Sequence, residues 1–305
     1  MRIITVNMEH VVQNRTPIAA CIGYFDGMHI GHQQLISKTI DAAKKYNCES
    51  ALITFDPDPW VAIKDIHDVQ HLMTMRQRIG KAADLGIRNI VILHFTKEMS
   101  QLSPDDFYTR ILLPCNLKAL ICGFDFHYGF KGAGDAVMLK NHADFEVDVI
   151  PAVEDEKGKI SSTRITGLIQ NGNVTEAAEL LGGYYEIEGN IIHGRAKGTK
   201  IGFPTANVDY CDENILPKPG VYACYAYING KKFKAMVNLG HNPTMNFSKK
   251  LSLEAHIIDF DDSLYGKRVS LQFVKYLRPE MHFQCVINLQ MQLEQDLKRT
   301  RSILK

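Results

Sequence analysis

The sequence lacks an excess of charge of either sign. Its 305 residues include 35 Lys and Arg against 34 Asp and Glu, so the formal net charge is +1. Proteins that bind nucleic acid or anionic membranes over a broad surface usually carry a clear basic excess. We therefore expect neither nucleic acid nor a membrane among the partners, and weak self-association stays open.

Long apolar runs and paired cysteines are also lacking. No apolar stretch approaches the roughly 20 residues that span a bilayer. Asn7, Glu9 and His10 interrupt the N-terminal segment, so it does not resemble a signal peptide. The seven cysteines are scattered, odd in number and without a C-x-x-C pair, which argues against a disulfide framework and against a zinc site. These absences predict a cytoplasmic protein with reduced thiols.

The first 180 residues alternate between apolar runs of strand length and helical patterns, which is typical of a parallel α/β sheet. The predicted strands cover residues 18–22, 51–55, 89–95, 118–122 and 145–150. The predicted helices cover residues 33–46, 75–85, 104–112, 163–170 and 175–181.

The pattern changes after Gly182-Gly183. Residues 184–277 form short apolar runs with frequent turn signals, and Asn229-Gly230 between two of these runs indicates a hairpin. Such a series predicts a small antiparallel barrel, followed by an amphipathic helix over residues 286–304. The chain is long enough for two cores, so we predict two domains, 1–182 and 183–305.

The loop from Gly23 to His32 follows the first predicted strand and precedes the first helix. Ligands collect at such loops, since they lie at the carboxyl ends of parallel strands and helix N-termini offer free N–H groups to anions. His29 and His32 can both donate hydrogen bonds to charge developing on a phosphoryl group. The alternative is an ordinary loop with two solvated histidines.

The H-x-G-H motif in this setting resembles the signature of the nucleotidylyltransferase superfamily. The longer string GYFDGMHIGH resembles the FMN adenylyltransferase module of bacterial bifunctional riboflavin kinase/FAD synthetases, as do residues 55–59, 123–129 and 159–165. The resemblance implies a Rossmann-like nucleotidylyltransferase domain with His29 and His32 as catalytic residues. It implies nucleotide contacts from Gly23, Phe25, Asp26, Gly27, Gly31, Ser162, Thr163 and Arg164, and flavin contacts from Asp125 and Phe126.

Two positions depart from that family pattern. Asp58 stands where the family usually has His, and Thr166 stands where it usually has an Arg that binds the ATP phosphates. Arg164 is close in sequence, but two residues along a helix correspond to about 200° of rotation, so it should not point the same way.

A second motif covers residues 194–207 and combines three glycines with three cations, which is suited to binding phosphate. Thr205 and Asn207 lie on one face of an extended segment and can offer two oxygen ligands to Mg²⁺. The alternative is a glycine-rich loop with solvated lysines. The motif resembles the riboflavin kinase signature, which implies Glu254 as the general base. It also implies nucleotide contacts from Gly194, Lys197, Gly198 and Gly202, and a flavin contact from Arg278.

The resemblance implies a two-step enzyme that uses ATP and Mg²⁺. Riboflavin is phosphorylated to FMN, and FMN is adenylylated to FAD with release of pyrophosphate. Four alternatives stay open: a riboflavin kinase with a weak adenylyltransferase domain, favoured by Thr166; a different adenylyl- or cytidylyltransferase; a class I aminoacyl-tRNA synthetase, although no Lys-Met-Ser-Lys-Ser motif is evident; and a non-catalytic flavin or RNA sensor.

Overall fold

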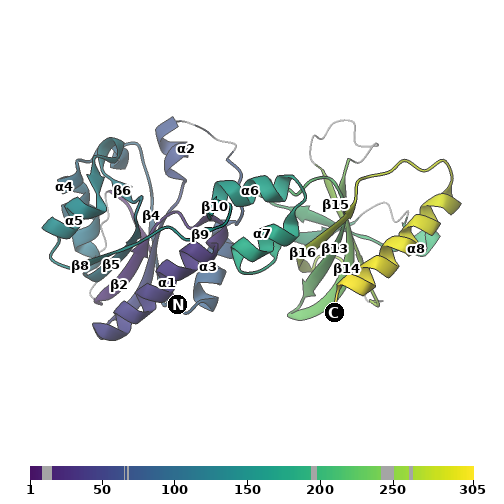
Figure 1. Cartoon of the computed structure of the whole chain (residues 1–305), viewed down its shortest axis with the longest axis horizontal. Coiled ribbons are helices and arrows are strands. Elements are labelled where there is room, and N and C mark those ends of the chain that lie inside the picture. Colours follow the sequence, from purple (N-terminus) through teal and green to yellow (C-terminus); the bar gives the residue numbers. More distant parts are fainter. Residues whose placement is uncertain (9–15, 65, 67–68, 194–197, 242–250, 261–263) are drawn as a thin grey trace. The chain divides into compact units, whose positions relative to one another are not determined.

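The computed structural model describes residues 1–8, 16–64, 66, 69–193, 198–241, 251–260 and 264–305 (Figure 1). The chain divides into two compact units, Met1–Ser162 and Thr163–Lys305. In each unit the fold class is the one predicted from the sequence.

The first unit is built on a six-stranded parallel sheet with strand order β1-β4-β3-β2-β5-β8. The strands are β1 (Arg2–Val6), β2 (Ile18–Ile22), β3 (Glu49–Phe55), β4 (Asn89–Leu93), β5 (Leu117–Gly123) and β8 (Glu146–Ile150). The five predicted strands are confirmed. The edge strand β1 was not predicted, because only its last residue is fully buried and its sequence shows no continuous apolar run.

Helices cover both faces of this sheet, and the alternation of side chains along β2 shows how. Ile18, Ala20 and Ile22 lie in one apolar cluster, whereas Ala19 and Cys21 lie in another. The second cluster also contains residues of α1 (Ile30–Lys45) and α3 (Met75–Asp84). Both predicted helices are confirmed, and α1 begins three residues earlier than predicted because His29 is its N-cap.

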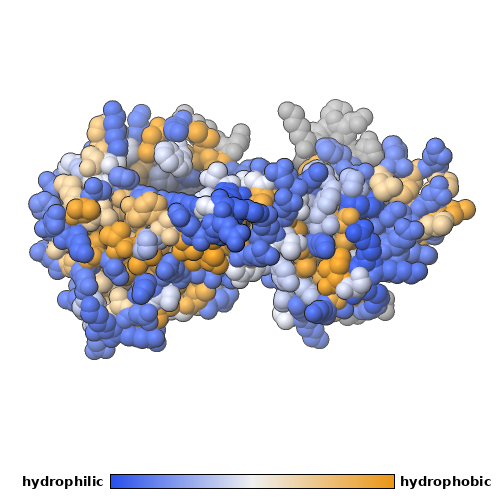
Figure 2. Space-filling model, viewed as in Figure 1, coloured by the Kyte–Doolittle hydropathy of each residue, from blue (hydrophilic) through white to orange (hydrophobic). Residues whose placement is uncertain are grey.

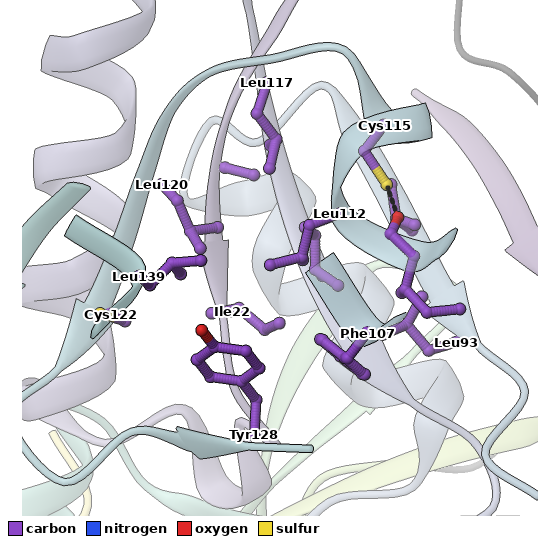
Figure 3. Packing of buried hydrophobic residues seen from close by; sticks show 14 of the residues in the cluster. Ile22, Leu93, Phe107, Leu112, Cys115, Leu117, Leu120, Cys122, Tyr128 and Leu139 are labelled. Carbon is purple, nitrogen blue, oxygen red and sulfur yellow. Dashed lines mark hydrogen bonds between the residues drawn. The ribbon is translucent and has the colours of Figure 1, made fainter. Parts of the chain in front are cut away.

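The first cluster is covered by the segment after Ser103, which caps α4 (Pro104–Phe107) by accepting a hydrogen bond from the backbone N–H of Asp106. The predicted helix over 104–112 continues as a π-helical turn, η3 (Tyr108–Leu112). Figure 3 shows Phe107, Leu112 and the ring of Tyr128 packed around Ile22 and Leu120. The helix α5 (Ala136–His142) adds Leu139 to the same cluster.

Several short elements complete the first unit. They are η1 (Asp26–Met28), α2 (Pro59–Lys64), η2 (Met99–Gln101), η4 (Leu113–Cys115), β6 (His127–Tyr128) paired with β7 (Gly134–Asp135), η5 (Phe130–Gly132), and the hairpin of β9 (Glu154–Asp155) and β10 (Gly158–Lys159).

The second unit is a closed antiparallel barrel with strand order β11-β12-β15-β14-β13-β16. Its strands are β11 (Tyr185–Ile192), β12 (Ala206–Tyr210), β13 (Gly220–Ile228), β14 (Lys231–Gly240), β15 (Ser252–Ile257) and β16 (Arg268–Arg278). Asn229 and Gly230 have φ of 51° and 75° between β13 and β14, which confirms the predicted hairpin. A short turn, η6 (Gly198–Ile201), precedes β12.

Helices α6 (Ser162–Gln170), α7 (Val174–Leu181) and α8 (Val286–Ile303) pack with the barrel unit. Thr175 Oγ1 donates to the Val274 carbonyl at 3.0 Å, and the Lys218 N–H donates to the Ile169 carbonyl at 3.2 Å. The compact unit therefore begins at Thr163. The boundary between functional domains at Gly182-Gly183 stays a prediction. In the part of the chain described, no helix combines the length and apolarity needed to cross a membrane.

Candidate active sites

The loop between β2 and α1 has an unusual backbone. Phe25, Gly27 and Met28 have φ of 58°, 76° and 44°. A non-glycine residue costs about 1–2 kcal/mol in this left-handed region, so the surroundings must hold it there. Phe25 and Met28 are fully buried, and Ser162 Oγ donates to the Asp26 carbonyl at 2.8 Å. The loop is therefore fixed by its own side chains and by Ser162 of the segment 159–165.

The two histidines of the H-x-G-H motif are brought together face to face. His29 is the N-cap of α1, and its Nδ1 accepts a hydrogen bond from the backbone N–H of His32 at 3.4 Å. The rings stack with centroids 3.7 Å apart and planes 17° apart. Since Nδ1 of His29 is an acceptor, a neutral ring carries its proton on Nε2 and can donate from there. Nδ1 of His32 is buried and has no hydrogen-bond partner among the described residues.

Burial holds both histidines neutral. It is the largest cause that lowers the pKa of His29 to about 4, and the positive charge of Lys159 contributes. The pKa of His32 lies well below its ordinary value, again mainly through burial and then through electrostatic interaction with His29, Arg78 and Lys159. At neutral pH each ring therefore supplies an N–H donor rather than a positive charge.

Gly31 allows this packing. A Cβ at position 31 would lie 3.2 Å from Cε1 and Nδ1 of His29 and 3.8 Å from Cβ of Val153. Gly23 is less confined, since its nearest neighbour is the Phe25 ring at 3.4 Å. A side chain at position 31 would therefore press on the His29 ring, which would have to move by a few tenths of an ångström.

Residues 159–162 lie against this loop through Ser162 and contact the segment 123–129 through Lys159. The Ile160 N–H donates to the Val153 carbonyl at 2.9 Å. Lys159 Nζ lies 2.5 Å from Asp125 Oδ2 and 4.7 Å from the centroid of the Phe124 ring. The structure thus brings three separate sequence motifs together at the carboxyl ends of the strands.

Two residues predicted to contact substrates have packing roles as well. Both carboxylate oxygens of Asp26 accept backbone N–H groups, from Leu72 at 3.1 Å and Met73 at 3.0 Å, and burial raises the pKa of this carboxyl. The ring of Phe126 stacks on Tyr128, with centroids 5.7 Å apart. Substrate contacts from these two residues stay predictions.

Arg78 was not among the predicted site residues. It is only 2% exposed, on the buried face of α3, and its guanidinium carbon lies 4.4 Å from the centroid of the Tyr24 ring. Its Nη1 donates to Thr54 Oγ1 at 3.4 Å, and its Nε has no partner among the described residues. The sequence signal available for Arg78 was a cationic residue on the face of α3 that is buried against the rest of the unit.

Thr163 and Arg164 open the second compact unit. There Arg164 Nη2 lies 3.9 Å from Glu176 Oε1 of α7. Contacts from these two residues to a nucleotide stay predictions.

The barrel places the predicted kinase residues on neighbouring strands. Glu254 of β15 lies directly opposite Asn207 of β12 and directly opposite Asn238 of β14. Opposite residues of antiparallel strands project from the same face, and Thr205 Oγ1 donates to Glu254 Oε2 at 3.3 Å. This set of carboxylate, amide and hydroxyl oxygens fits the preference of Mg²⁺ for hard oxygen ligands. Asn238 was not predicted as a site residue.

The described part of the glycine-rich segment forms a tight turn before Thr205. The Phe203 N–H donates to the Gly198 carbonyl at 2.9 Å, and a Cβ at position 198 would lie 2.1 Å from the Phe203 carbonyl oxygen. Gly202 has a φ of 81°. Both positions therefore require glycine. Two other predicted nucleotide contacts, Gly194 and Lys197, lie outside the described residues.

Arg278 ends β16, in the same cross-strand row as Glu254. Arg278 pairs with Val221 of β13, Val221 pairs with Asn238 of β14, and Asn238 pairs with Glu254 of β15. Its Nε donates to Asp296 Oδ2 of α8 at 2.8 Å.

Comparisons with known proteins find two family models that match successive parts of the chain. A family model described as FAD synthetase matches residues 11–164, and one described as riboflavin kinase matches residues 181–304. The bifunctional riboflavin kinase/FMN adenylyltransferase of Listeria monocytogenes is 37% identical over 284 residues, covering 92% of this chain and 90% of the relative. The protein of the same name from Bacillus subtilis is 31% identical over 301 residues, covering 96% and 95%. A solved structure from Streptococcus pneumoniae, titled macrolide-efflux protein, is 34% identical, covers 98% of this chain and 99% of its own, and has a TM-score of 0.91.

Proposed function

Because the chain belongs to the bifunctional riboflavin kinase/FMN adenylyltransferase family, we propose that it converts riboflavin to FAD in two ATP-dependent steps. The barrel unit transfers the γ-phosphoryl group of ATP to riboflavin and forms FMN and ADP. The N-terminal part of the chain, residues 1–182, transfers the adenylyl group of a second ATP to FMN and releases pyrophosphate. The observation that supports the proposal is that residues predicted to act together are in contact within each unit: His29 stacks on His32, and Thr205, a predicted metal ligand, donates to Glu254, the predicted base.

In the kinase step, Glu254 is positioned to take the proton of the ribityl 5′-hydroxyl as that oxygen attacks the γ-phosphorus. Thr205 and Asn207 would hold Mg²⁺, which neutralises phosphate charge when bound. The turn from Gly198 to Gly202 offers backbone N–H groups to the phosphates. Arg278 would contact the flavin.

In the adenylyl transfer, a phosphate oxygen of FMN attacks the α-phosphorus of ATP directly, the bond to the β-phosphate oxygen breaks, and pyrophosphate leaves. His29 and His32 stabilise the developing charge as neutral hydrogen-bond donors. Lys159 and Arg78 add positive charge nearby. No covalent enzyme intermediate is required.

We assign the adenylyltransferase to residues 1–182 and the kinase to residues 183–305. The use of ATP in both steps supports a cytoplasmic location. Small molecules suffice as partners, and weak self-association is compatible with either step.

Product analysis after incubation with riboflavin, ATP and Mg²⁺ tests the proposal. FAD is the expected product. Glu254→Gln should abolish FMN formation but keep FAD formation from supplied FMN. His32→Ala should do the reverse and lower FAD formation by about 10²–10³-fold, the usual loss for one preorganised donor. Accumulation of FMN without FAD would favour the single-activity kinase that Thr166 suggests, and the absence of both products would refute the proposal.

A further inference from the structure

Helix α8 distributes its polar and apolar residues in an unexpected way. Apolar side chains near its start are exposed, at the right-hand end of the view in Figure 2, and they include Val286, Ile287 and Met291. Leu293 and Leu297 instead pack on the barrel. Between these two leucines, on the covered face, the helix carries Asp296, which is 0% exposed. A buried carboxylate is costly unless it is paired and hydrogen-bonded, so its partners indicate what it does.

Both carboxylate oxygens of Asp296 are occupied. Oδ2 accepts from Arg278 Nε at 2.8 Å, and Oδ1 accepts from Gln292 Nε2 at 3.0 Å. The Arg278 side chain is itself 12% exposed, and its Nη1 donates to the Pro279 carbonyl at 2.9 Å. Within the described part of the chain, no hydrogen bond occupies Nη2. The ion pair at Nε therefore fixes the orientation of the guanidinium plane. The Nη2 group is left to donate a hydrogen bond to a ligand.

The same helix also contacts the glycine-rich turn. Gln290 Nε2 donates to the Ile201 carbonyl of η6 at 3.4 Å. Arg278 belongs to the cross-strand row that contains Asn238 and Glu254. Helix α8 thus holds one residue at each of two parts of the kinase site, the turn that would bind phosphate and the strand end that would bind flavin.

We infer that Asp296 is a positioning residue for the kinase step. It holds the Arg278 guanidinium in the orientation that donates to the polar groups of riboflavin, and it contacts no substrate itself. The inference rests on the proposed kinase function. Its physical reason is preorganisation: an arginine whose plane is already fixed loses little conformational freedom when a ligand binds. A buried ion pair that serves only stability is the competing explanation.

The test is Asp296→Asn, which keeps the side-chain size and removes the charge. The KM for riboflavin and the Kd from flavin fluorescence quenching should each rise about tenfold, a factor that corresponds to about 1.4 kcal/mol. The kcat and the KM for ATP should stay within about threefold. Glu294→Gln, on the exposed side of the same helix, is the matched control and should change none of these values.

A second variant separates positioning from stability. In an Arg278→Ala background, adding Asp296→Asn should cause no further rise in the riboflavin Kd, because a residue that acts only through Arg278 has nothing left to orient. If Asp296→Asn does not fold, Gln292→Met removes the other hydrogen bond to the carboxylate and should raise the riboflavin Kd about two- to threefold.

An unchanged riboflavin Kd in Asp296→Asn, or an equal rise with and without Arg278, would overturn the inference. If Gln292→Met has to replace that variant, an unchanged Kd overturns it in the same way. Wild-type protein that forms no FMN would instead refute the proposed function, so the two failures are distinguishable.

Discussion

The buried histidine pair makes the stability of the first unit depend on pH. His29 is 6% exposed, and its pKa is lowered to about 4 by burial and by the charge of Lys159. In the unfolded chain a histidine titrates near pH 6.5. Between these values the unfolded chain binds a proton that the folded chain does not, so acidification favours unfolding.

The magnitude follows from the two pKa values. For His29 alone, lowering the pH from 7 to 5 should reduce the free energy of unfolding by about 2 kcal/mol. His32 acts in the same direction, because its pKa is also lowered. Asp26 acts in the opposite direction: its raised pKa lets the folded chain bind a proton first, which stabilises the folded state on acidification. A comparison with a variant that lacks only His29 isolates one contribution.

His29→Asn is suited to this comparison, since asparagine is also a good N-cap residue. The chain has one tryptophan, Trp60 in α2, so its fluorescence during urea denaturation reports on the first unit. Between pH 7 and pH 5 the wild type should lose about 2 kcal/mol more stability than the variant. Equal losses in the two proteins would show that His29 is not held neutral in the folded state, and the argument for a neutral donor would fail.

Three further substitutions test the geometry of the sites. Gly31→Ala should lower FAD formation about tenfold or more, because its Cβ would lie 3.2 Å from the ring of His29. Gly80→Ala, whose Cβ meets nothing within 4 Å, is the control and should leave both steps unchanged in steady-state assays. Gly198→Ala should abolish FMN formation and spare FAD formation from supplied FMN, because its Cβ would lie 2.1 Å from the Phe203 carbonyl oxygen. Normal kinase activity in this variant would show that the turn is not required. Thr166→Arg should lower the KM for ATP in adenylyl transfer about tenfold or more, since a charge-assisted contact contributes roughly 1.5–3 kcal/mol. An unchanged or raised KM would show that another cation already fills the role.

The strands of both units could largely be predicted because their signals are local. Strand β2 is buried at all five positions and therefore shows a continuous apolar run. Asn229-Gly230 marked the β13–β14 hairpin for an equally local reason, since both residues adopt positive φ. Strand β1 is the counterexample: it is held by pairing with β4 rather than by its own burial.

The residues of the site that were missed depend on tertiary contacts. Asn238 is placed beside Glu254 only by strand register, which the sequence does not reveal. Asp296 offered a signal, because it falls on the stripe defined by Leu293 and Leu297 where an apolar residue is expected. Its partner, Arg278, lies on another element, so the pattern could indicate a buried carboxylate without indicating what it orients.

The charges around the histidine pair bear on how strongly ATP binding should depend on a cation at position 166. Since burial holds both imidazoles neutral, positive charge at this site must come from other groups. Lys159 and Arg78 both lie in the first unit and both lower the pKa of His32, so two cations already act on the histidine pair. Lys159 keeps 43% of its side chain exposed beside Asp125 and is therefore accessible to a ligand. The family pattern's arginine at position 166 would then be one source of positive charge among several, and the gain expected from Thr166→Arg lies near the tenfold end of its range.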